Sequence, residues 1–598
     1  MADHGPYGAR LGANVQGAQT RFCAWTVARE CAVCLYDQLG ALRSRHPLEA
    51  RGDGLFELSL ADAGHGTLYK FELDGRALPD PYARFLPQGV HGPAMVVEPR
   101  YRFRQPQVRP LPLSKQAIYE LHVGTFTELG TYRAAIERLP ALVQLGVTCI
   151  ELMPVAAFDG ARGWGYDGVA LFAPFAPYGS PDELRELVDA AHDLSLSVLL
   201  DVVYNHFGPA GNYLSQYHPA YFAHDLPNAW GDSPNFAHPA MRALVLASAR
   251  YWLDEFRFDG LRFDAVHAIV DHSEPHVLRE LVQELRSLDP ERILIAEDDR
   301  NDPDVVEQVG LDALWADDFH HQLRVTLTGE RDGYYAAYEP GVEQLAKVIE
   351  RGWLYEGQPY PSSGKPRGKP RGALPAHSLV YCIQNHDQIG NRALGERLNA
   401  EVSLDAFCMA SALLLFLPST PLLFMGQEWA ASSPFLFFSD HEASLGEAVS
   451  RGRREEFKHF EAFSRPEARA SIPDPQAEQT FLRSRLRWQE REREPHAQVL
   501  ALYTKLLALR RTDPVLSDGL SGTLRADVTA GLLRVRRSLA GQDRVLLANF
   551  GDQAVALDQV DFPPDSTRIL ITGQVLERDM LAPQSALILA AGTIGLSA

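Results

Sequence analysis

Four apolar segments of the chain end in acidic side chains, most of them with histidine or arginine close by. The segments close as Asp201-Val-Val-Tyr-Asn-His206, Gly260-Leu-Arg-Phe-Asp-Ala-Val-His267, Ile295-Ala-Glu297 and Gln384-Asn-His-Asp387. A single acidic residue after an apolar strand is usually a helix cap or an ion-pair partner. Four such ends around one mouth would bring like charges together, at a desolvation and repulsion cost that folding alone does not require. The joint pattern therefore predicts a catalytic site built from carboxylates.

Three of these carboxylates, Asp264, Glu297 and Asp387, suit the cleavage of a glycosidic bond. Cleavage with retention needs an ionised carboxylate that attacks the anomeric carbon and a protonated carboxyl for the leaving oxygen, about 5 to 5.5 Å apart. Arg262 precedes Asp264 by two residues on the same strand face, so we expect it to keep that aspartate ionised. Glu297 follows an apolar run, and crowding by the other carboxylates would raise its pKa toward the acid role.

The elements that must position these residues follow a repeating pattern of apolar strands and amphipathic helical stretches. We expect strands at residues 117–123, 148–153, 197–203, 260–264, 293–297, 313–316, 379–384 and 421–425. Parallel strands covered on both faces are continuous apolar runs, and eight such units predict an α/β fold, a closed (β/α)8 TIM barrel. Long insertions are expected between the third and fourth strands and between the sixth and seventh. In such a barrel the C-terminal strand ends carry the active site.

Short strands separated by turn residues flank the barrel region. Strands at 21–25, 32–36, 55–59 and 68–73 predict an N-terminal β-sandwich, immunoglobulin-like and carbohydrate-binding-module-like, over residues 1–110. Closely spaced prolines at 108–113 indicate a linker. After a helix at 499–509, strands at 532–536, 545–550 and 585–589 predict a C-terminal antiparallel β-domain over residues 526–598. The catalytic barrel with its inserted loops then occupies residues 111–525.

The composition excludes several classes of partner. A chain of 598 residues that is 46% hydrophobic and 22% charged is typical of folded soluble proteins. Its net charge of −20, with no offsetting stripe of basic residues, disfavours nucleic acid and anionic membranes as partners. The first residues lack the basic and apolar regions of a secretory signal, so we expect a cytoplasmic protein. Prolines 418 and 421 break the apolar stretch 407–425, which favours a buried helix followed by a buried strand over a membrane span.

Six cysteines are scattered along the chain, and only Cys31 and Cys34 form a Cys-x-x-Cys pair. This pair lies in an apolar, strand-like run with no second pair and no histidine cluster beside it. We therefore interpret the cysteines as buried strand residues in a reducing compartment, and not as a zinc or redox site.

The four strand ends resemble, in order and in strand context, the signature segments of the alpha-amylase superfamily of glycoside hydrolases. The resemblance covers roughly residues 115–430. It implies that Asp264 is the nucleophile, Glu297 the general acid/base and Asp387 the carboxylate that stabilises the transition state, with Asp201 supporting them. Asn205 matches a position that binds structural calcium in many amylases, but no cluster of further oxygen ligands accompanies it. We expect no metal and no cofactor.

The same resemblance, with the strand positions, suggests residues that contact the sugar. Tyr166 in Trp164-Gly-Tyr-Asp-Gly168 matches the stacking tyrosine of the superfamily, and sugars present apolar C–H faces to aromatic rings. His206 and His386 would hydrogen-bond sugar hydroxyls as neutral imidazoles, and the alternative is a buried structural histidine. The residues expected to bind substrate are Tyr166, Asp201, His206, Arg262, His267, Asp317, Asp318, Phe319, His320, His321, His386, Gln388 and Asn391.

Further segments are similar to one family of the superfamily, the maltooligosyltrehalose trehalohydrolases. They include Pro79-Asp-Pro-Tyr82, Tyr119-Glu-Leu-His-Val-Gly-Thr-Phe126, Trp315-Ala-Asp-Asp-Phe-His-His321 and Pro473-Asp-Pro-Gln476. This similarity implies hydrolysis of the α-1,4 bond next to the terminal trehalose of maltooligosyltrehalose, in trehalose biosynthesis after a maltooligosyltrehalose synthase. Residues 317–321 would hold the trehalose, and the alternative is a helix cap with a surface histidine pair.

Three other functions stay open. A glycogen branching enzyme and an isoamylase-type debranching enzyme share much of the architecture, but they usually lack a residue like His267 three positions after the nucleophile. A glycan-binding protein built on a decayed barrel is disfavoured by the three intact carboxylates. The cationic segment 361–372 is unstructured by composition and is either a mobile lid beside the cleft or a solvated surface loop.

Overall fold

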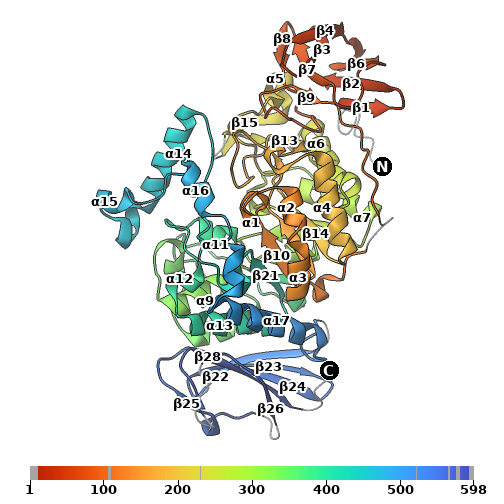
Figure 1. The fold of residues 1–598 in the computed structure, drawn as a ribbon. Helices are drawn as coiled ribbons and strands as arrows, with labels where there is room; N and C mark the ends of the chain where they lie inside the picture. The colour runs from red at the N-terminus through yellow and green to blue at the C-terminus, as the bar shows by residue number, and fades with distance from the viewer. Residues whose placement is uncertain are drawn as a thin grey trace.

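A closed barrel of eight parallel strands forms the centre of the molecule (Figure 1). The structure is a computed structural model that describes residues 11–104, 109–228, 231–519, 522–562, 566–573 and 580–591. The barrel strands are β10 (Ile118–Leu121), β11 (Cys149–Leu152), β14 (Ser197–Val202), β17 (Gly260–Phe263), β18 (Ile293–Glu297), β19 (Ala313–Trp315), β20 (Leu379–Tyr381) and β21 (Thr420–Phe424). Pairing of β21 with β10 closes the ring. The predicted TIM barrel is confirmed, with the seventh strand ending at Tyr381, before its predicted end at residue 384.

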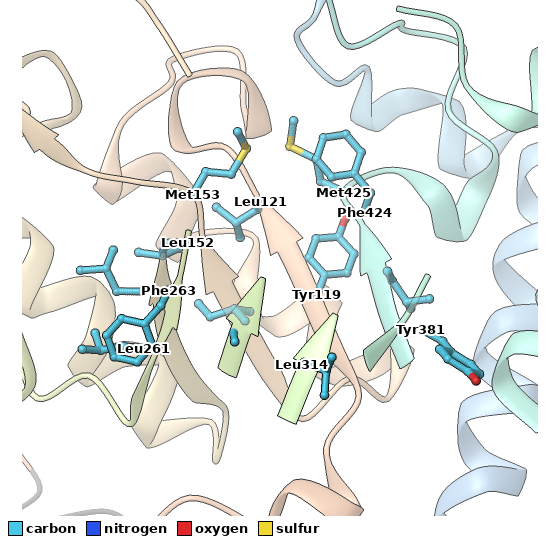
Figure 2. Packing of buried hydrophobic residues seen from close by; sticks show 14 of the residues in the cluster. Tyr119, Leu121, Leu152, Met153, Leu261, Phe263, Leu314, Tyr381, Phe424 and Met425 are labelled. Atoms are coloured by element: carbon cyan, nitrogen blue, oxygen red, sulfur yellow. The ribbon is translucent and has the colours of Figure 1, made fainter. Parts of the chain in front are cut away.

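Alternation along the strands sends charged and apolar side chains to opposite faces. On β17 the buried Leu261 and Phe263 belong to the large core between strands and helices, a portion of which Figure 2 shows. Successive side chains of a strand point to opposite faces, so Arg262 points into the barrel. The interior below it is filled by a separate apolar cluster that includes Ile118, Leu199, Ile295, Trp315 and Leu422. The barrel is therefore packed at its floor and charged at its C-terminal mouth.

Helices cover the outside of the barrel, and two long insertions rise from its mouth. The covering helices include α4 (Pro181–Asp193), α6 (Pro239–Glu255), α7 (Val277–Leu288), α10 (Val342–Arg351), α13 (Leu404–Phe416) and α17 (His496–Thr512). The insertion between β14 and β17 carries α5 (Leu214–Tyr217), β15 (Phe222–Asn228) and β16 (Gly231–Pro234), and the one between β19 and β20 carries α9 (Asp318–Thr328). Helix α13 followed by β21 confirms the buried helix and strand expected at 407–425. Among the described helices none is long and apolar enough to cross a membrane.

Two antiparallel sheets form the N-terminal region, at one end of the molecule (Figure 1). One sheet holds β1 (Gly12–Gln16), β2 (Gln19–Trp25), β6 (Leu55–Leu60) and β5 (Glu49–Gly52), and the other holds β4 (Leu42–Pro47), β3 (Cys31–Tyr36), β7 (Leu68–Leu73), β8 (Arg76–Leu78) and β9 (Ala94–Met95). A core that includes Phe22, Val33, Tyr69 and Phe71 joins the two sheets. The predicted N-terminal sandwich is confirmed.

The N-terminal sheets are seated on the insertion after β14. The ring of Trp25 stacks on His218 with centroids 3.7 Å apart. The Tyr82 and Tyr221 hydroxyls hydrogen-bond at 3.0 Å, and the Tyr217 hydroxyl donates to the Pro79 carbonyl at 3.0 Å. These contacts join the N-terminal sheets and the barrel into a single packed unit.

A five-stranded antiparallel sheet forms the opposite end (Figure 1). Its strands are β22 (Thr523–Thr529), β23 (Leu532–Leu539), β24 (Gln542–Asn549), β28 (Ser585–Ala591) and β26 (Thr567–Ile571), and β25 (Val555–Ala556) pairs with β27 (Met580–Leu581) beside it. The predicted C-terminal β-domain is confirmed, but β22 begins before the predicted limit at 526. The domain limits stay predictions, and Val108 of the predicted linker lies outside the described residues.

All six cysteines are free. Cys23, Cys31, Cys34, Cys149 and Cys382 are buried, and Cys408 is partly buried. Four of them, Cys23, Cys31, Cys34 and Cys149, are buried strand residues as predicted. Cys382 is buried just beyond the end of β20, and Cys408 lies in α13, so the strand interpretation is wrong for these two.

Candidate active site

The side chain of Arg262 connects the acidic residues at the mouth of the barrel. Its Nη1 donates to Asp201 Oδ2 at 2.5 Å and to Asp264 Oδ1 at 3.2 Å, and its Nη2 donates to Glu297 Oε2 at 2.5 Å. The guanidinium lies 4.1 Å from the ring centroid of Trp315. Arg262 has 0% exposure and holds these three carboxylates in place. Substrate binding by Arg262 stays a prediction.

Asp264 follows β17 and is held by Asn205. The Asn205 amide nitrogen donates to Asp264 Oδ2 at 2.7 Å and to its backbone oxygen at 2.8 Å. Burial raises the pKa of Asp264 above its ordinary value, and the opposing charge of Arg262 does not cancel this effect. Arg262 therefore lowers the pKa of Asp264 in the expected direction, but burial outweighs it, and the same guanidinium contacts Glu297 at a shorter distance.

Glu297 ends β18 on the same face as the inward-pointing Ile295. Its Oε2 accepts a hydrogen bond from the backbone N–H of Ala265 at 3.0 Å. Ala265 reaches this position with a left-handed φ of 37° directly after Asp264. Burial, and then the charge of Asp264, raises the pKa of Glu297 against the effect of Arg262. The raised pKa is the predicted direction and suits a group that must carry a proton.

Asp387 lies in α11 (His386–Gly390), and Asn391 Nδ2 donates to its Oδ1 at 3.1 Å. His386 Nε2 lies 3.4 Å from Asp387 Oδ2, and its Nδ1 contacts Glu120. Burial alone would lower the pKa of His386, but Asp387 and Glu120 raise it to about 10. The raised pKa favours a buried imidazolium that pairs with these carboxylates, so the expected neutral state of His386 is wrong. Sugar binding by His386 stays a prediction.

Two more predicted sugar ligands are buried behind the mouth. Asp201 is 2% exposed and accepts from the Tyr166 hydroxyl at 2.6 Å. His206 Nε2 lies 2.8 Å from the Tyr166 carbonyl oxygen, and its Nδ1 contacts Asn205. Both ring nitrogens of His206 bind protein atoms, which agrees with the structural alternative. Substrate binding by Asp201 and His206 stays a prediction, and the supporting role of Asp201 agrees with its contacts.

Tyr166 remains partly exposed at the mouth. One face of its ring stacks on His386, with centroids 5.1 Å apart and planes at 21°. This contact fixes the ring orientation, and stacking of a sugar on Tyr166 stays a prediction.

A cavity of about 750 Å³ opens beside Glu297 and Asp387. Its lining residues are Glu297, Asp299, Arg300, Asp302, Asp317, His321, Tyr334, Tyr360, Ser363, Lys365, Pro366, Arg367, Gly368, Lys369, Asp387, Gln388 and Asn391. Ligand pockets in proteins are usually about 300 to 1,000 Å³. Of the residues expected to bind substrate, the structure places Asp317, His321, Gln388 and Asn391 here.

Helical geometry divides the predicted segment 317–321 between the cavity and the core. Asp317 and His321 are four residues apart at the start of α9 and line the cavity together. Asp318 and Phe319 are fully buried, and the Phe319 ring stacks on Tyr381 with centroids 4.4 Å apart. His320 is 2% exposed, and burial lowers its pKa well below the ordinary value. The burial of Asp318, Phe319 and His320 favours a structural role, and substrate binding by these residues stays a prediction.

Asp317 has an unusual environment among the lining residues. Burial, and then the charges of Glu297 and Asp387, raises the pKa of Asp317 to about 7. A pKa near 7 means that Asp317 would change its charge near neutral pH, beside Glu297 and Asp387.

His267 lies outside the lining of this cavity. Its Nδ1 is 3.6 Å from Asp299 Oδ1, and its side chain is 29% exposed. His267, Asp298 and Asp299 could offer three ligand atoms to a cation, but Arg300 pairs with Asp298 at 2.5 Å. At the position matched to calcium-binding amylases, both ends of the Asn205 amide bind protein atoms. Substrate binding by His267 stays a prediction.

Residues 357–369, which we call the strap, form most of one cavity wall. The Gly357 N–H donates to the Arg367 carbonyl at 2.7 Å and the Tyr360 N–H to the Lys365 carbonyl at 2.8 Å. Pro359 and Pro366 form an antiparallel bridge between these bonds. The strap is a short hairpin, so the expectation of an unstructured segment at 361–372 is wrong for the stretch that the strap includes.

Sequence reasoning missed several lining residues. Tyr334 donates from its hydroxyl to Gln388 Oε1 at 3.1 Å, and Tyr360 belongs to the strap. Arg300 and Asp302 follow β18 by only a few residues. No spacing marks the two tyrosines, but the position of Arg300 and Asp302 just beyond a catalytic strand end was a signal that could have found them.

Comparisons with known proteins identify the family to which the chain belongs. The alpha-amylase family, described as "Alpha amylase, catalytic domain", matches residues 118–219. A malto-oligosyltrehalose trehalohydrolase from Deinococcus radiodurans is 53% identical over 562 residues, which cover 93% of this chain and 92% of that protein. The chain belongs to the malto-oligosyltrehalose trehalohydrolase family.

A second named relative and a solved structure are similar to this chain over most of its length. The malto-oligosyltrehalose trehalohydrolase of Arthrobacter ramosus is 42% identical and covers 83% of this chain and 88% of its own. A solved structure, a putative alpha amylase from Salmonella typhimurium, is 38% identical with a TM-score of 0.89, covering 97% of this chain and 99% of that one. The protein is thus a glycoside hydrolase of the alpha-amylase superfamily. The glycogen-branching, debranching and non-catalytic alternatives are not favoured.

Proposed function

We propose that this protein hydrolyses the α-1,4-glucosidic bond next to the terminal trehalose of maltooligosyltrehalose and releases trehalose, with retention at the anomeric carbon. The observation that carries the chemistry is the bridge from Arg262 to both Asp264 and Glu297. The family supplies the substrate, since the named relatives are trehalohydrolases.

The reaction has two steps in this proposal. Asp264 attacks the anomeric carbon while the carboxyl of Glu297 donates its proton to the leaving glycosidic oxygen. The bond from carbon to the leaving oxygen breaks, and a covalent glycosyl–Asp264 intermediate forms. Glu297, now ionised, takes a proton from water, and the resulting attack at the anomeric carbon frees Asp264.

The neighbouring groups support these charge changes. Arg262 remains within hydrogen-bond distance of both carboxylates, so it limits the repulsion when Glu297 becomes ionised. Asp387 places a further carboxylate at the mouth, where it would stabilise the positive charge that develops on the sugar. His386 beside it offsets some of this negative charge.

Product analysis tests the substrate. We expect incubation with maltooligosyltrehalose to release free trehalose, maltohexaose to be attacked slowly, and amylose to yield no new branches. Branched product from amylose would instead assign the protein to the branching enzymes, and the anomeric form of the first product, read by NMR, tests retention.

The cellular setting belongs to the same proposal. The substrate ends in trehalose, so a maltooligosyltrehalose synthase has to act before this protein. The six free thiols suit the reducing cytoplasm, where we place it.

A further inference from the structure

The strap is held firmly at its second arm. Arg367 Nε donates to the Asp299 carbonyl at 3.0 Å, and its Nη1 donates to the Tyr338 hydroxyl at 3.1 Å. Its Nη2 is 3.3 Å from Asp318 Oδ1. The guanidinium also lies over the ring of Tyr360, 4.6 Å from its centroid. Arg367 thus ties both arms of the hairpin to the barrel.

A second set of contacts follows directly. Lys369 Nζ bonds to Asp302 at 2.8 Å and to Asp304 at 2.6 Å. Gly368 has a φ of 81°, and a Cβ there would lie 2.0 Å from the Tyr355 carbonyl oxygen. Only glycine allows this close approach, so the strap rests directly on the segment that contains Tyr355.

The tip of the strap is free of such anchors and faces the cavity. Ser363 and Lys365 both line it. Lys365 is exposed, and within the described portion of the chain its ammonium group forms no ion pair, in contrast to Lys369. The positive charge of Lys365 is therefore available to a ligand.

The position of the catalytic groups identifies which side of the cleft this cavity is. Glu297 lines it, whereas the nucleophile Asp264 does not. Glu297 protonates the oxygen of the leaving group in the proposed reaction, so the leaving group must lie on the Glu297 side. The cavity under the strap is the leaving-group side.

We infer that the strap selects the leaving disaccharide, with Lys365 donating hydrogen bonds to its hydroxyls. This inference rests on the proposed function. Sugar hydroxyls donate as well as accept, and the cavity offers carboxylates such as Asp317 on the α9 side and the ammonium of Lys365 on the strap. In trehalose both anomeric carbons are in the linkage, so its two rings present a different array of hydroxyls from those of maltose. Arg367 and Lys369 fix the position of this wall. Because the wall cannot rearrange to fit both sets of hydroxyls, it distinguishes trehalose from maltose.

Direct binding and kinetics of Lys365→Ala test the inference. A charge-assisted hydrogen bond contributes about 1.5 to 3 kcal/mol when well formed, and exposure reduces this, so we expect trehalose to bind about five- to tenfold more weakly. Maltotriose, which can occupy the opposite side of the cleft, should inhibit as strongly as before. The ratio of kcat/KM for maltooligosyltrehalose over maltohexaose should fall by a similar factor.

Two controls separate the outcomes. Lys505→Ala removes another lysine, on α17 and outside the cavity lining, and should change neither ligand. Lys365→Gln keeps a neutral donor and should fall between wild type and Lys365→Ala. Unchanged trehalose affinity and an unchanged substrate ratio in Lys365→Ala would overturn the inference. Wild-type enzyme that releases no trehalose from maltooligosyltrehalose would instead overturn the proposed function.

Discussion

At the scale of single residues, the mouth of the barrel contains more buried carboxyl groups than buried cations. One guanidinium, Arg262, contacts Asp201, Asp264 and Glu297, and one imidazolium, His386, contacts Glu120 and Asp387. Two cations among five carboxyl groups cannot neutralise them all. Ionised carboxylates that are close together raise one another's pKa, so this imbalance favours a proton on at least one of them. A site that begins its reaction with a protonated acid needs such an imbalance.

The first prediction concerns that acid. Replacing Glu297 by Gln removes the proton donor but preserves its size, so kcat should fall by about a hundred- to ten-thousandfold. Turnover of maltooligosyltrehalose measures the loss, and circular dichroism checks the fold. Glu343→Gln, a change on the covering helix α10, is the matched control and should leave kcat unchanged. Near-normal turnover in Glu297→Gln would refute the assigned role.

The second prediction is a pH dependence set by Asp317, whose pKa is raised to about 7. Below this pH Asp317 is neutral, and above it the new negative charge opposes ionisation of Glu297 and so keeps the acid protonated. Asp317→Asn lacks that charge at every pH. Its alkaline limb of kcat/KM should therefore move to lower pH, by roughly half a unit to one unit.

The same raised pKa affects stability with a definite sign. Folded Asp317 holds its proton up to about pH 7, whereas the unfolded chain releases it near the ordinary aspartate value. Stability contributed by this group is therefore present at low pH and lost as the pH rises toward 7. The free energy of unfolding of wild type should therefore fall relative to that of Asp317→Asn as the pH rises toward 7. Curves of the free energy of unfolding against pH that run parallel for the two proteins would argue against the raised pKa.

At the scale of elements, the barrel strands could be predicted because parallel strands buried on both faces are nearly continuous apolar runs. The strands at 149–152 and 197–202 are buried throughout, and polar side chains interrupt their apolar sequence at Glu151, Ser197 and Asp201. Alternation then predicts that Glu297 shares a face with Ile295. The conformations of the loops could be predicted less well from the sequence. Asp318 and Asp317 are adjacent and chemically identical, and only the onset of α9 at Asp318 sends one into the core and the other to the cavity.

The strap is a second case in which the local sequence did not predict the conformation. Its composition of Gly, Pro, Lys and Ser is that of a flexible linker. The hairpin depends on partners distant in sequence, Asp299 for Arg367 and Asp302 for Lys369, which no local pattern reveals. Tertiary contacts thus decide the conformation where the local sequence does not.

The third prediction tests how the strap is supported from α9. Asp318 is fully buried and accepts from the Leu354 N–H at 2.7 Å, Asn301 Nδ2 at 2.9 Å and the Tyr338 hydroxyl at 2.6 Å. Asp318→Asn leaves some of these donors facing another donor, so the free energy of unfolding should fall by about 3 kcal/mol. Denaturant unfolding measures this change.

The control for this element is Asp254→Asn, an exposed aspartate on α6. It should alter the free energy of unfolding by less than about 0.5 kcal/mol. Trehalose binding should weaken in Asp318→Asn because the support of the strap is lost, and equal stability of the two variants would contradict the role given to Asp318.

At the scale of the whole molecule, the C-terminal sheet shares its core with the barrel helices. Leu533, Leu546 and Ile588 of this sheet belong to the same apolar cluster as Leu413 of α13. Arg537 Nη1 reaches the Phe416 carbonyl at 2.9 Å, and Arg544 Nε donates to Asp513 Oδ2 at 2.8 Å just after α17. The sheet is therefore an integral structural component of the hydrolase.

The fourth prediction uses that last pair. Asp513 and Arg544 are 4% and 0% exposed, and removing one partner leaves a buried charge without its counterion. Asp513→Asn should lower the free energy of unfolding by about 3 to 5 kcal/mol. The double variant Asp513→Asn, Arg544→Met should recover some of this loss, because it no longer buries an unpaired cation. Thermal unfolding provides the comparison, and additive losses would show that the pair is not coupled.

The burial of the native thiols allows an introduced cysteine to be labelled selectively for spectroscopy. Burial raises the pKa of Cys23, Cys31 and Cys408 to about 12 and that of Cys34 to about 11. Cys149 and Cys382 are raised well above their ordinary value. Alkylating dyes react with the thiolate, which these side chains rarely form at neutral pH. A cysteine introduced at Ser363 would therefore accept a fluorophore ahead of all six native thiols, and its emission would report on sugar entering beneath the strap in the otherwise native chain.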